Sequence, residues 1–126
     1  MATRHELRVH VLMVSERPLA RRHRRFCQQI CDAASSAARN IAEGFGRFRP
    51  KEFAQYVRIA KASECEVRDL LIEAHQRRLV NQSERDEYLL LARRAIGAAT
   101  GLVRYLERAA ESGPFWRENP IDPAAC

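Results

Sequence analysis

The chain has 126 residues, of which 46% are hydrophobic and 30% charged, and its formal net charge is +6. This length suits one domain that buries its core without disulfides or metal ions, and the balance of apolar and charged residues excludes a disordered chain. Because it holds only five glycines and five prolines, the chain lacks the frequent turns of a β protein and is predicted to be all-α.

The expected cellular location follows from the lack of long apolar stretches. The longest such stretch near the start, residues 11–14, is far too short to span a membrane, and no signal-peptide cleavage pattern follows it. We therefore expect a cytoplasmic protein with no membrane partner.

The four cysteines, Cys27, Cys31, Cys65 and Cys126, are expected to be reduced thiols in that compartment. Cys27 and Cys31 stand one helical turn apart with His23 one turn earlier, so one helix face carries three possible metal ligands. A fourth ligand and the paired C-x-x-C spacing are missing, which favours buried small side chains over a metal site. No metal and no cofactor are predicted.

The first helix is expected at about residues 3–16. Its apolar residues between Leu7 and Val14 fit either a strand or a short helix, but a lone strand would leave its backbone groups without partners. Pro18 is expected to end this helix.

Basic charge is concentrated in the same N-terminal region. Residues 1–25 carry seven arginines and two glutamates, a net +5, and they end in a run that contains Arg21, Arg22, Arg24 and Arg25. Such a run attracts polyanions, so it is a candidate nucleic-acid contact; a solvated helix face is the alternative.

Three more helices are expected, at about residues 20–43, 50–78 and 83–111. Gly44 is read as a left-handed cap of the second, Pro50 as the first residue of the third, and Ser83 with Asp86 as a capping box of the fourth. The short connection at residues 80–82 folds the fourth helix back on the third. The prediction is an antiparallel, up-and-down four-helix bundle over residues 1–113. Residues 114–126 are expected to form an irregular tail whose aromatic residues pack on the bundle.

Small side chains mark two places of expected close approach. Residues 33–38 and 97–101 contain only alanine, serine, threonine and glycine, so the two stretches are predicted to cross each other or a neighbouring subunit at short distance. The fourth helix also carries two adjacent apolar stripes, which indicates that it packs on more than one surface.

A sequence signature accompanies these helices. It consists of Ser36-x-x-x-Asn40-Ile-Ala-Glu43-Gly, followed by Ile59-Ala-x-x-Ser63-x-x-Glu66. Over residues 26–111 the chain thus resembles the bacterial four-helix-bundle family associated with ribosomal-RNA intervening sequences. The resemblance implies an antiparallel bundle that assembles into a ring-like homo-oligomer, a pentamer in characterised relatives. It also implies likeness to retroelement accessory proteins, which are thought to bind nucleic acid and a reverse transcriptase through a basic surface.

The polar residues of the signature are candidates for a site. Ser36, Asn40, Glu43, Ser63 and Glu66 lie at helical spacing on two consecutive helices, but no nucleophile with a neighbouring base is among them. They are therefore predicted to form a buried structural network with Arg47, and the protein is not expected to be an enzyme.

The turn at residues 44–49 mixes phenylalanines with Arg47 and Arg49, a combination that can stack bases and contact phosphates; a simple helix–helix turn is the alternative. The candidate nucleic-acid-binding residues are thus Arg21, Arg22, Arg24, Arg25, Arg47 and Arg49. Two functions remain open: an RNA- or DNA-binding accessory module, or a protein–protein adaptor or assembly scaffold whose arginines are only solvated.

Overall fold

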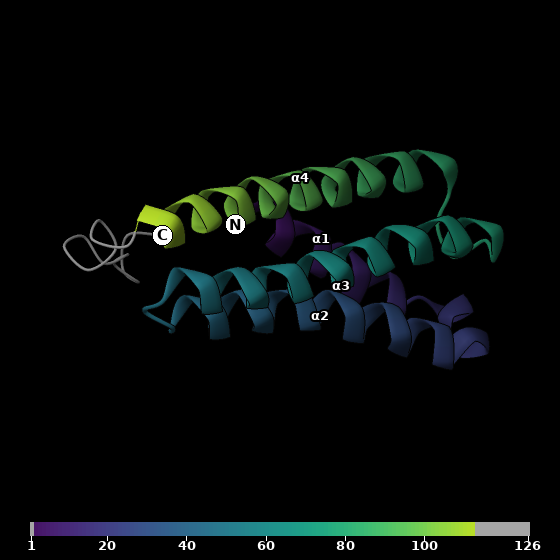
Figure 1. Cartoon of the computed structure of the whole chain (residues 1–126). Helices are drawn as coiled ribbons and strands as arrows, with labels where there is room; N and C mark the ends of the chain where they lie inside the picture. Colours follow the sequence, from purple (N-terminus) through teal and green to yellow (C-terminus); the bar gives the residue numbers. More distant parts are fainter. Residues whose placement is uncertain (1, 113–126) are drawn as a thin grey trace.

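The computed structural model describes residues 2–112, which form four α-helices and one 3-10 helix with no strand among them (Figure 1). The elements are α1 (Ala2–Ser15), η1 (Pro18–His23), α2 (Arg24–Phe45), α3 (Pro50–Gln76) and α4 (Gln82–Ser112). The all-α prediction is confirmed, and so is the helical reading of the first segment. No described helix is both long enough and apolar enough to cross a membrane. The predicted tail at 114–126 lies outside the described residues.

The four helices differ greatly in length and in their neighbours. α3 packs along α2 on one side and along α4 on the other, and α1 lies against α2 and α4. α1 has 14 residues whereas α4 has 31, which correspond to about 21 Å and about 46 Å. α1 therefore covers only part of the length of the longer helices (Figure 1).

The core divides into two clusters, which define two halves of the molecule. The four-helix half is built on residues from α1, η1, α2, α3 and α4, among them Leu7, Val11, Ile30 and Leu71. The three-helix half contains no residue of α1; its members come from α2, α3 and α4 and are Ala37, Ile41, Phe53, Ala54, Val57, Ala60, Ala99 and Leu106.

A buried ion pair lies where the two halves meet. Glu64 is 1% exposed and follows Ala60 on the buried face of α3, and one of its carboxylate oxygens accepts a hydrogen bond from Arg4 Nε of α1. The other oxygen, Oε2, has no hydrogen-bond partner in the part of the chain that the structure describes. Burial raises the pKa of Glu64, and Arg4 partly opposes this shift. The pair thus fixes where the N-terminal end of α1 rests.

The N-cap of α4 lies two residues before the predicted one, at Asn81 instead of Ser83. Asn81 and Glu84 exchange the two bonds of a capping box: Glu84 N donates to Asn81 Oδ1 (2.8 Å), and Asn81 N donates to Glu84 Oε1 (3.0 Å). The predicted capping box of Ser83 with Asp86 is therefore wrong, because α4 already begins at Gln82.

α3 ends in a left-handed turn made without glycine. Arg78 has a φ of 62°, Arg78 N donates to His75 O (3.0 Å), and Leu79 N donates to Ala74 O (2.9 Å). These two bonds make a Schellman motif, and the side chain of Leu79, the residue after Arg78, is buried in the core. The motif turns the chain toward Asn81 and projects Arg78 outward.

The predicted role of Gly44 is wrong. α2 continues through Gly44 to Phe45 in right-handed geometry, and Gly44 is buried. A Cβ at this position would lie 2.6 Å from Tyr56 Cβ and 2.9 Å from Phe53 Cδ1. Glycine is needed here because α2 and α3 approach closely, and not because the backbone turns left-handed.

Two further predictions need correction. Residues 20–23, expected in a long second helix, belong to η1, because Pro18 begins a 3-10 helix instead of simply ending α1. Among residues 2–112 the predicted close crossing does not occur at Gly97 and Gly101, since a Cβ at either position would meet no atom of this part of the chain within 4 Å. Close approach to a neighbouring subunit there stays a prediction.

Candidate nucleic-acid interface

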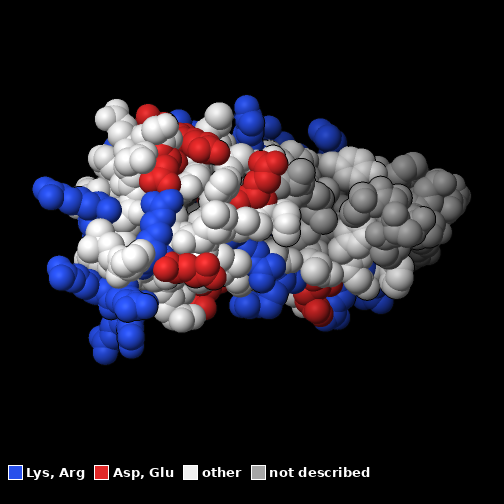
Figure 2. Space-filling model, turned by 180° about the vertical axis from the view of Figure 1, so that it is seen from behind, with Lys and Arg blue, Asp and Glu red and all other residues white. Residues whose placement is uncertain are grey.

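One end of the molecule carries a concentration of free arginines. Arg21, Arg22, Arg24 and Arg25 occupy η1 and the first turn of α2, and all four side chains are exposed. None of them forms an ion pair within residues 2–112. Figure 2 shows lysine and arginine side chains projecting from this end, on the left of the view. The four positive charges therefore face solvent without internal neutralisation.

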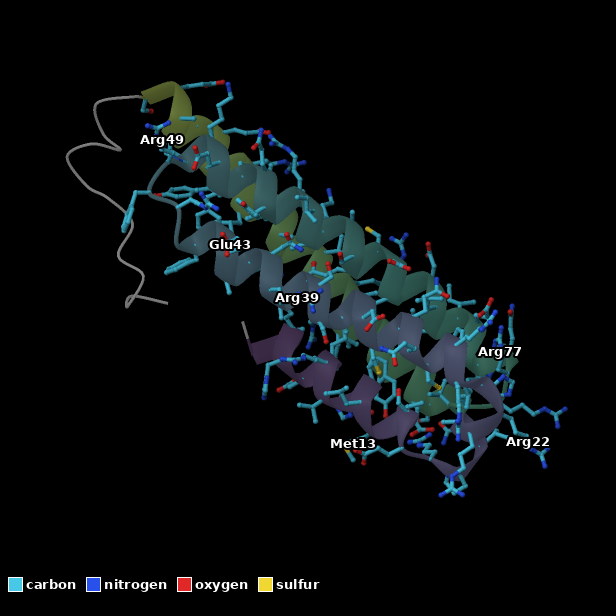
Figure 3. All side chains as sticks on the ribbon, turned by 90° about the horizontal axis from the view of Figure 1, so that it is seen from below. Met13, Arg22, Arg39, Glu43, Arg49 and Arg77 are labelled. Atoms are coloured by element: carbon cyan, nitrogen blue, oxygen red, sulfur yellow. The ribbon has the colours of Figure 1, made fainter. Side chains whose placement is uncertain are left out.

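The turn between α3 and α4 adds two arginines that were not among the candidates predicted from the sequence. Arg77 Nη1 lies 2.9 Å from His23 Nδ1, its guanidinium lies 4.7 Å from the centroid of the Phe26 ring, and it also binds Glu73. Figure 3 shows Arg77 and Arg22 at the same end of the bundle. The neighbouring Arg78 is exposed. We call Arg21, Arg22, Arg24, Arg25, Arg77 and Arg78 the arginine end.

The short linker between α1 and η1, which precedes the arginine end, is bonded through Arg17 to the start of α4. Arg17 Nη1 donates to Leu79 O (2.9 Å) and to Glu84 Oε1 (3.0 Å), and the two side chains form an ion pair. The hydrogen bond from Arg17, together with the Asn81 backbone bond, lowers the pKa of Glu84 to about 2. Glu84 therefore ties the segment before η1 to the start of α4.

Arg49 lies at the opposite end of the bundle (Figure 3), and Arg47 precedes it by two residues in the turn between α2 and α3. α2 separates them from the arginine end by 22 residues, or about 33 Å. Both have acidic neighbours: Arg47 Nη2 donates to Glu43 Oε1 (2.8 Å), and Arg49 Nη1 lies 3.8 Å from Glu52 Oε1. The six predicted arginines therefore do not form one surface on a protomer.

The aromatic residues of this turn have different roles. Phe45 is half-buried and packs edge-on against Phe53 at 5.6 Å between ring centroids, so it closes the end of the bundle. Phe48 is 61% exposed, which makes its ring the one of the two that is free to stack on a base.

The signature residues form a line along the α2–α3 seam, and not the single buried network that was predicted. Ser63 Oγ donates to Ser36 Oγ (3.0 Å), and Asn40 Nδ2 donates to Ser36 O (2.9 Å) and Oγ (3.2 Å). Glu66 instead accepts from Gln29 (3.2 Å), and Glu43 binds Arg47, both on the exposed surface. The reason is helical phase: the apolar stripes of both helices face the core, and these residues lie on the outer flank.

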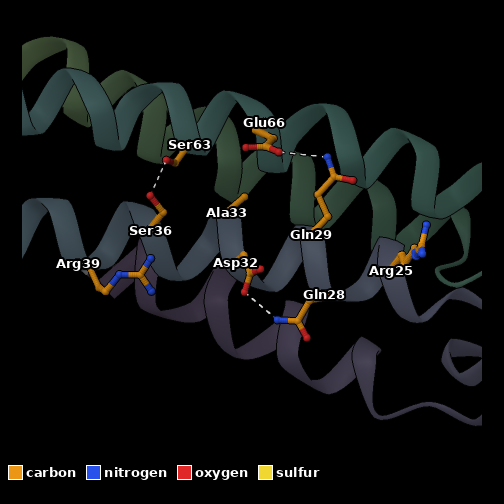
Figure 4. Close-up of a pocket in the computed structure, with 9 residues that line it drawn as sticks. All are labelled: Arg25, Gln28, Gln29, Asp32, Ala33, Ser36, Arg39, Ser63 and Glu66. Carbon is orange, nitrogen blue, oxygen red and sulfur yellow. Dashed lines mark hydrogen bonds between the residues drawn. The ribbon is translucent and has the colours of Figure 1, made fainter.

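A shallow polar pocket of about 500 Å³ opens on this seam (Figure 4). Arg25 and Arg39 lie at its two ends, and the carboxylates of Asp32 and Glu66 accept hydrogen bonds from Gln28 and Gln29. The nine residues that line it are Arg25, Gln28, Gln29, Asp32, Ala33, Ser36, Arg39, Ser63 and Glu66. The hydroxyls and amides can hydrogen-bond a polar ligand, but the lining holds no nucleophile with a base.

Cys27, Cys31 and His75 are not among the residues that line this pocket. Cys27 is buried, which raises the pKa of its thiol, and Cys31 Sγ lies 3.0 Å from Ser15 Oγ. His75 Nδ1 lies 3.5 Å from Arg85 Nη1. Within residues 2–112 no group of three or more His, Cys, Asp or Glu side chains is arranged to hold a metal ion.

The comparisons with known proteins agree with the signature. The sequence profile of the family described as 23S rRNA-intervening sequence protein matches residues 2–101. No curated protein and no solved structure matches the chain. Because the profile spans α1, α2, α3 and most of α4, the match covers both halves of the core and the arginine end. The chain belongs to the 23S rRNA-intervening sequence protein family.

Proposed function

We propose that this protein is a non-catalytic, cytoplasmic RNA-binding accessory module that acts as a homo-oligomer and contacts RNA through its arginine end. The observation that carries the proposal is the set of exposed arginines at that end, of which Arg21, Arg22, Arg24 and Arg25 have no ion-pair partner in residues 2–112. Each such side chain that neutralises a phosphate releases a counterion, which favours binding and makes it depend on salt.

Assembly strengthens this proposal. We propose an antiparallel up-and-down bundle that forms a ring-like homo-oligomer, with five protomers as the expected number. The outer face of α4 supports it, because Leu90 is exposed there and a Cβ at Gly97 or Gly101 would meet nothing within 4 Å among the described residues. Five copies of a weak phosphate site on one assembly bind a long RNA with much higher avidity than one copy does.

The mass of the purified protein in solution tests the assembly. A bulky substitution, Gly101→Leu, is expected to lower the mass from that of the oligomer to that of the protomer, because it fills the space that a neighbouring helix needs. An oligomer of unchanged mass would show that this face is not the interface.

A protein–protein adaptor is the second candidate. It is favoured by the solvent-facing side of α1, where Leu12 is 41% exposed and Met13 is 58% exposed. In that case the arginines are solvated only, and their removal does not weaken partner binding.

The experiment for RNA binding is fluorescence anisotropy of a labelled single-stranded RNA over a salt series. The test variant changes Arg21, Arg22, Arg24 and Arg25 to Ser. The control changes Arg47, Arg49, Lys51 and Arg104 to Ser, which removes the same formal charge elsewhere on the surface.

We expect steep salt dependence for the unchanged protein, loss of binding in the test variant and binding retained in the control. Equal losses in both variants would mean that net charge and not the arginine end is responsible. No binding at low salt would remove the RNA proposal and leave the adaptor.

A further inference from the structure

The polar pocket on the α2–α3 seam has no role in the proposed function, although part of the sequence signature lines it. Ser36, Ser63 and Glu66 belong to both. Its volume of about 500 Å³ falls within the range of about 300–1,000 Å³ that is common for small-ligand sites. All of its lining residues come from α2 and α3, so the pocket is separate from the outer face of α4, where the proposed function places a neighbouring subunit.

The lining of the pocket is formally neutral, in contrast to the arginine end. Arg25 and Arg39 supply two positive charges, and Asp32 and Glu66 supply two negative charges. Neither arginine forms an ion pair within residues 2–112. Each carboxylate instead accepts a hydrogen bond from an uncharged glutamine amide. A neutral group with both donors and acceptors therefore fits the pocket better than a further phosphate does.

Glu66 is the acceptor that the pocket holds in place. Gln29 Nε2 of α2 donates to Glu66 Oε1 of α3 (3.2 Å), so one carboxylate oxygen is fixed across the seam (Figure 4). The other oxygen, Oε2, accepts no hydrogen bond from the described part of the chain. A carboxylate has about four acceptor sites, so Glu66 can take two parallel donors from a ligand while it keeps its bond to Gln29.

Ser36 is a donor beside this acceptor. Its Oγ accepts hydrogen bonds from Ser63 Oγ (3.0 Å) and from Asn40 Nδ2 (3.2 Å). A hydroxyl has two acceptor sites and one hydrogen, so the hydrogen of Ser36 remains for a ligand when both acceptor sites are in use. Ser63 and Glu66 are three residues apart on α3, which puts their Cβ atoms about 5–6 Å apart. The donor and the acceptor are thus within reach of one small ligand.

This arrangement of donor and acceptor matches one RNA base. Guanine presents two adjacent donors, N1–H and N2–H, next to the acceptor O6, so a carboxylate can accept from both donors while a hydroxyl donates to O6. Adenine, cytosine and uracil do not place two donor groups against one carboxylate. The guanidinium of Arg25 or Arg39 suits the O6 and N7 acceptors on the adjoining edge of guanine.

The pocket is continuous with the arginine end. Arg25 belongs to both, and Ser36 lies about 17 Å further along α2. A strand of RNA whose phosphates bind the arginine end can therefore continue along the seam. Ala33, between Gln29 and Ser36 in Figure 4, is buried and offers only a methyl group, so the floor of the pocket leaves space for a flat ring.

We propose that the α2–α3 pocket holds one unpaired guanine of the RNA that the arginine end binds. Glu66 accepts from N1–H and N2–H of the base, and Ser36 donates to O6. Glu66 is then the residue that determines base preference. The inference rests on the proposed function and adds to it a preference for single strands that contain guanine.

Fluorescence anisotropy with short labelled single-stranded RNAs tests this preference. The RNAs have equal length and differ at one central nucleoside, which is guanosine, inosine, adenosine, cytidine or uridine in an otherwise uridine strand. We expect the guanosine RNA to bind about tenfold more tightly than the uridine RNA, as a bidentate base contact predicts. Inosine lacks the N2 amino group, so the inosine RNA should lose most of this advantage.

A matched pair of variants locates the preference. Glu66→Gln keeps the size of the side chain but replaces one acceptor by a donor, so it should abolish the preference. The control Asp69→Asn removes the same charge about one helical turn away, outside the pocket lining, and should keep it. The measured quantity is the ratio of the affinities for the guanosine and uridine RNAs, because loss of either negative charge strengthens binding of every RNA. Retained binding of the uridine RNA shows that Glu66→Gln is folded.

The outcomes separate this inference from the proposed function. Equal affinity for the guanosine and uridine RNAs would overturn the inference and leave RNA binding through the arginine end intact. A preference that survives in Glu66→Gln would also overturn it, since another group would then read the base. If no RNA binds at low salt, the proposed function and this inference both fail.

Discussion

The two halves of the core rest on the same three long helices, yet they are held together in different ways. The four-helix half includes polar anchors that join α1 and its linker to the rest, namely Arg4 with Glu64 and Arg17 with Glu84. The three-helix half lacks α1; an exposed ion pair, Arg58 with Glu107, joins its α3 and α4, and α2 approaches α3 closely at Gly44 against Tyr56. Buried or half-buried charged pairs thus position the short helix α1, whereas a small residue at Gly44 sets the spacing of α2 and α3.

The largest effect is expected from breaking the anchor between the halves. Arg4→Met leaves the Glu64 carboxylate buried without a partner, which should lower the free energy of unfolding by about 3 kcal/mol. The double variant Arg4→Met/Glu64→Met removes the buried charge as well and should recover most of this loss. Urea unfolding at pH 7 measures both, and an Arg4→Met variant as stable as the unchanged protein would contradict the anchor.

The pH dependence of Glu64 sharpens this test. Its pKa in the folded protein is raised above the ordinary value of 4.5, so its contribution to stability is present below pH 4.5 and is lost as the pH rises through the raised value. Glu64→Gln should therefore gain stability relative to the unchanged protein as the pH rises to neutral. A difference that stays constant with pH would show that Glu64 does not titrate differently on folding.

A smaller effect is expected in the three-helix half from Gly44→Ala. The added methyl would lie 2.6 Å from Tyr56 Cβ, so α2 and α3 must move apart, at a cost of about 2 kcal/mol. Thermal unfolding measures the change. A variant that unfolds at the same temperature would mean that the two helices can separate freely.

The capping box at the start of α4, in the four-helix half, is expected to contribute less to stability than Arg4 or Gly44, and its contribution depends on the ionised carboxylate of Glu84. Glu84→Gln should cost about 1 kcal/mol at pH 7, because it weakens the capping box and the contact with Arg17. The pKa of Glu84 is lowered to about 2, so its contribution is present above pH 4.5 and is lost as the pH falls toward 2. The stability gap between the two proteins should thus close on acidification, opposite in sign to the behaviour of Glu64.

The smallest effect is expected two residues from Gly44. Gly46 has a φ of −73°, and a Cβ there would meet its nearest atom, Glu43 O, at 3.5 Å. Gly46→Ala should raise stability by about 0.5 kcal/mol, since alanine lowers the entropy of the unfolded chain without strain in the folded one. A gain at Gly46 with a loss at Gly44 in the same unfolding assay would separate close approach from backbone freedom.

Sequence periodicity was sufficient to predict the helices but not their ends. Apolar spacing located all four α-helices, yet Pro18 was read only as a stop, although proline also suits the first turn of η1. The capping box was placed on Ser83 because Asn81 was assigned to the connection. The role of Gly44 depends on Tyr56, which belongs to another helix, so local turn chemistry alone was misleading.

The candidate site could be predicted only in part, again because some of its contacts join residues of different helices. The run of arginines from Arg21 is visible in the sequence, but only the fold brings Arg77 beside His23. Glu64 was overlooked although it falls in phase with Ala60 and Leu71 on the buried stripe of α3. A charged residue on an apolar stripe can be recognised from the sequence as a buried charge. Its partner Arg4, 60 residues away, can be identified only from the fold.

Mass-spectrometric mapping of ultraviolet crosslinks between the full protein and a single-stranded RNA shows directly which residues contact the RNA. We expect crosslinked peptides from η1, the start of α2 and the turn between α3 and α4, which together present the arginine end. Crosslinks confined to residues 43–56, around Arg47 and Arg49, would contradict it and would move the RNA contact to the three-helix half.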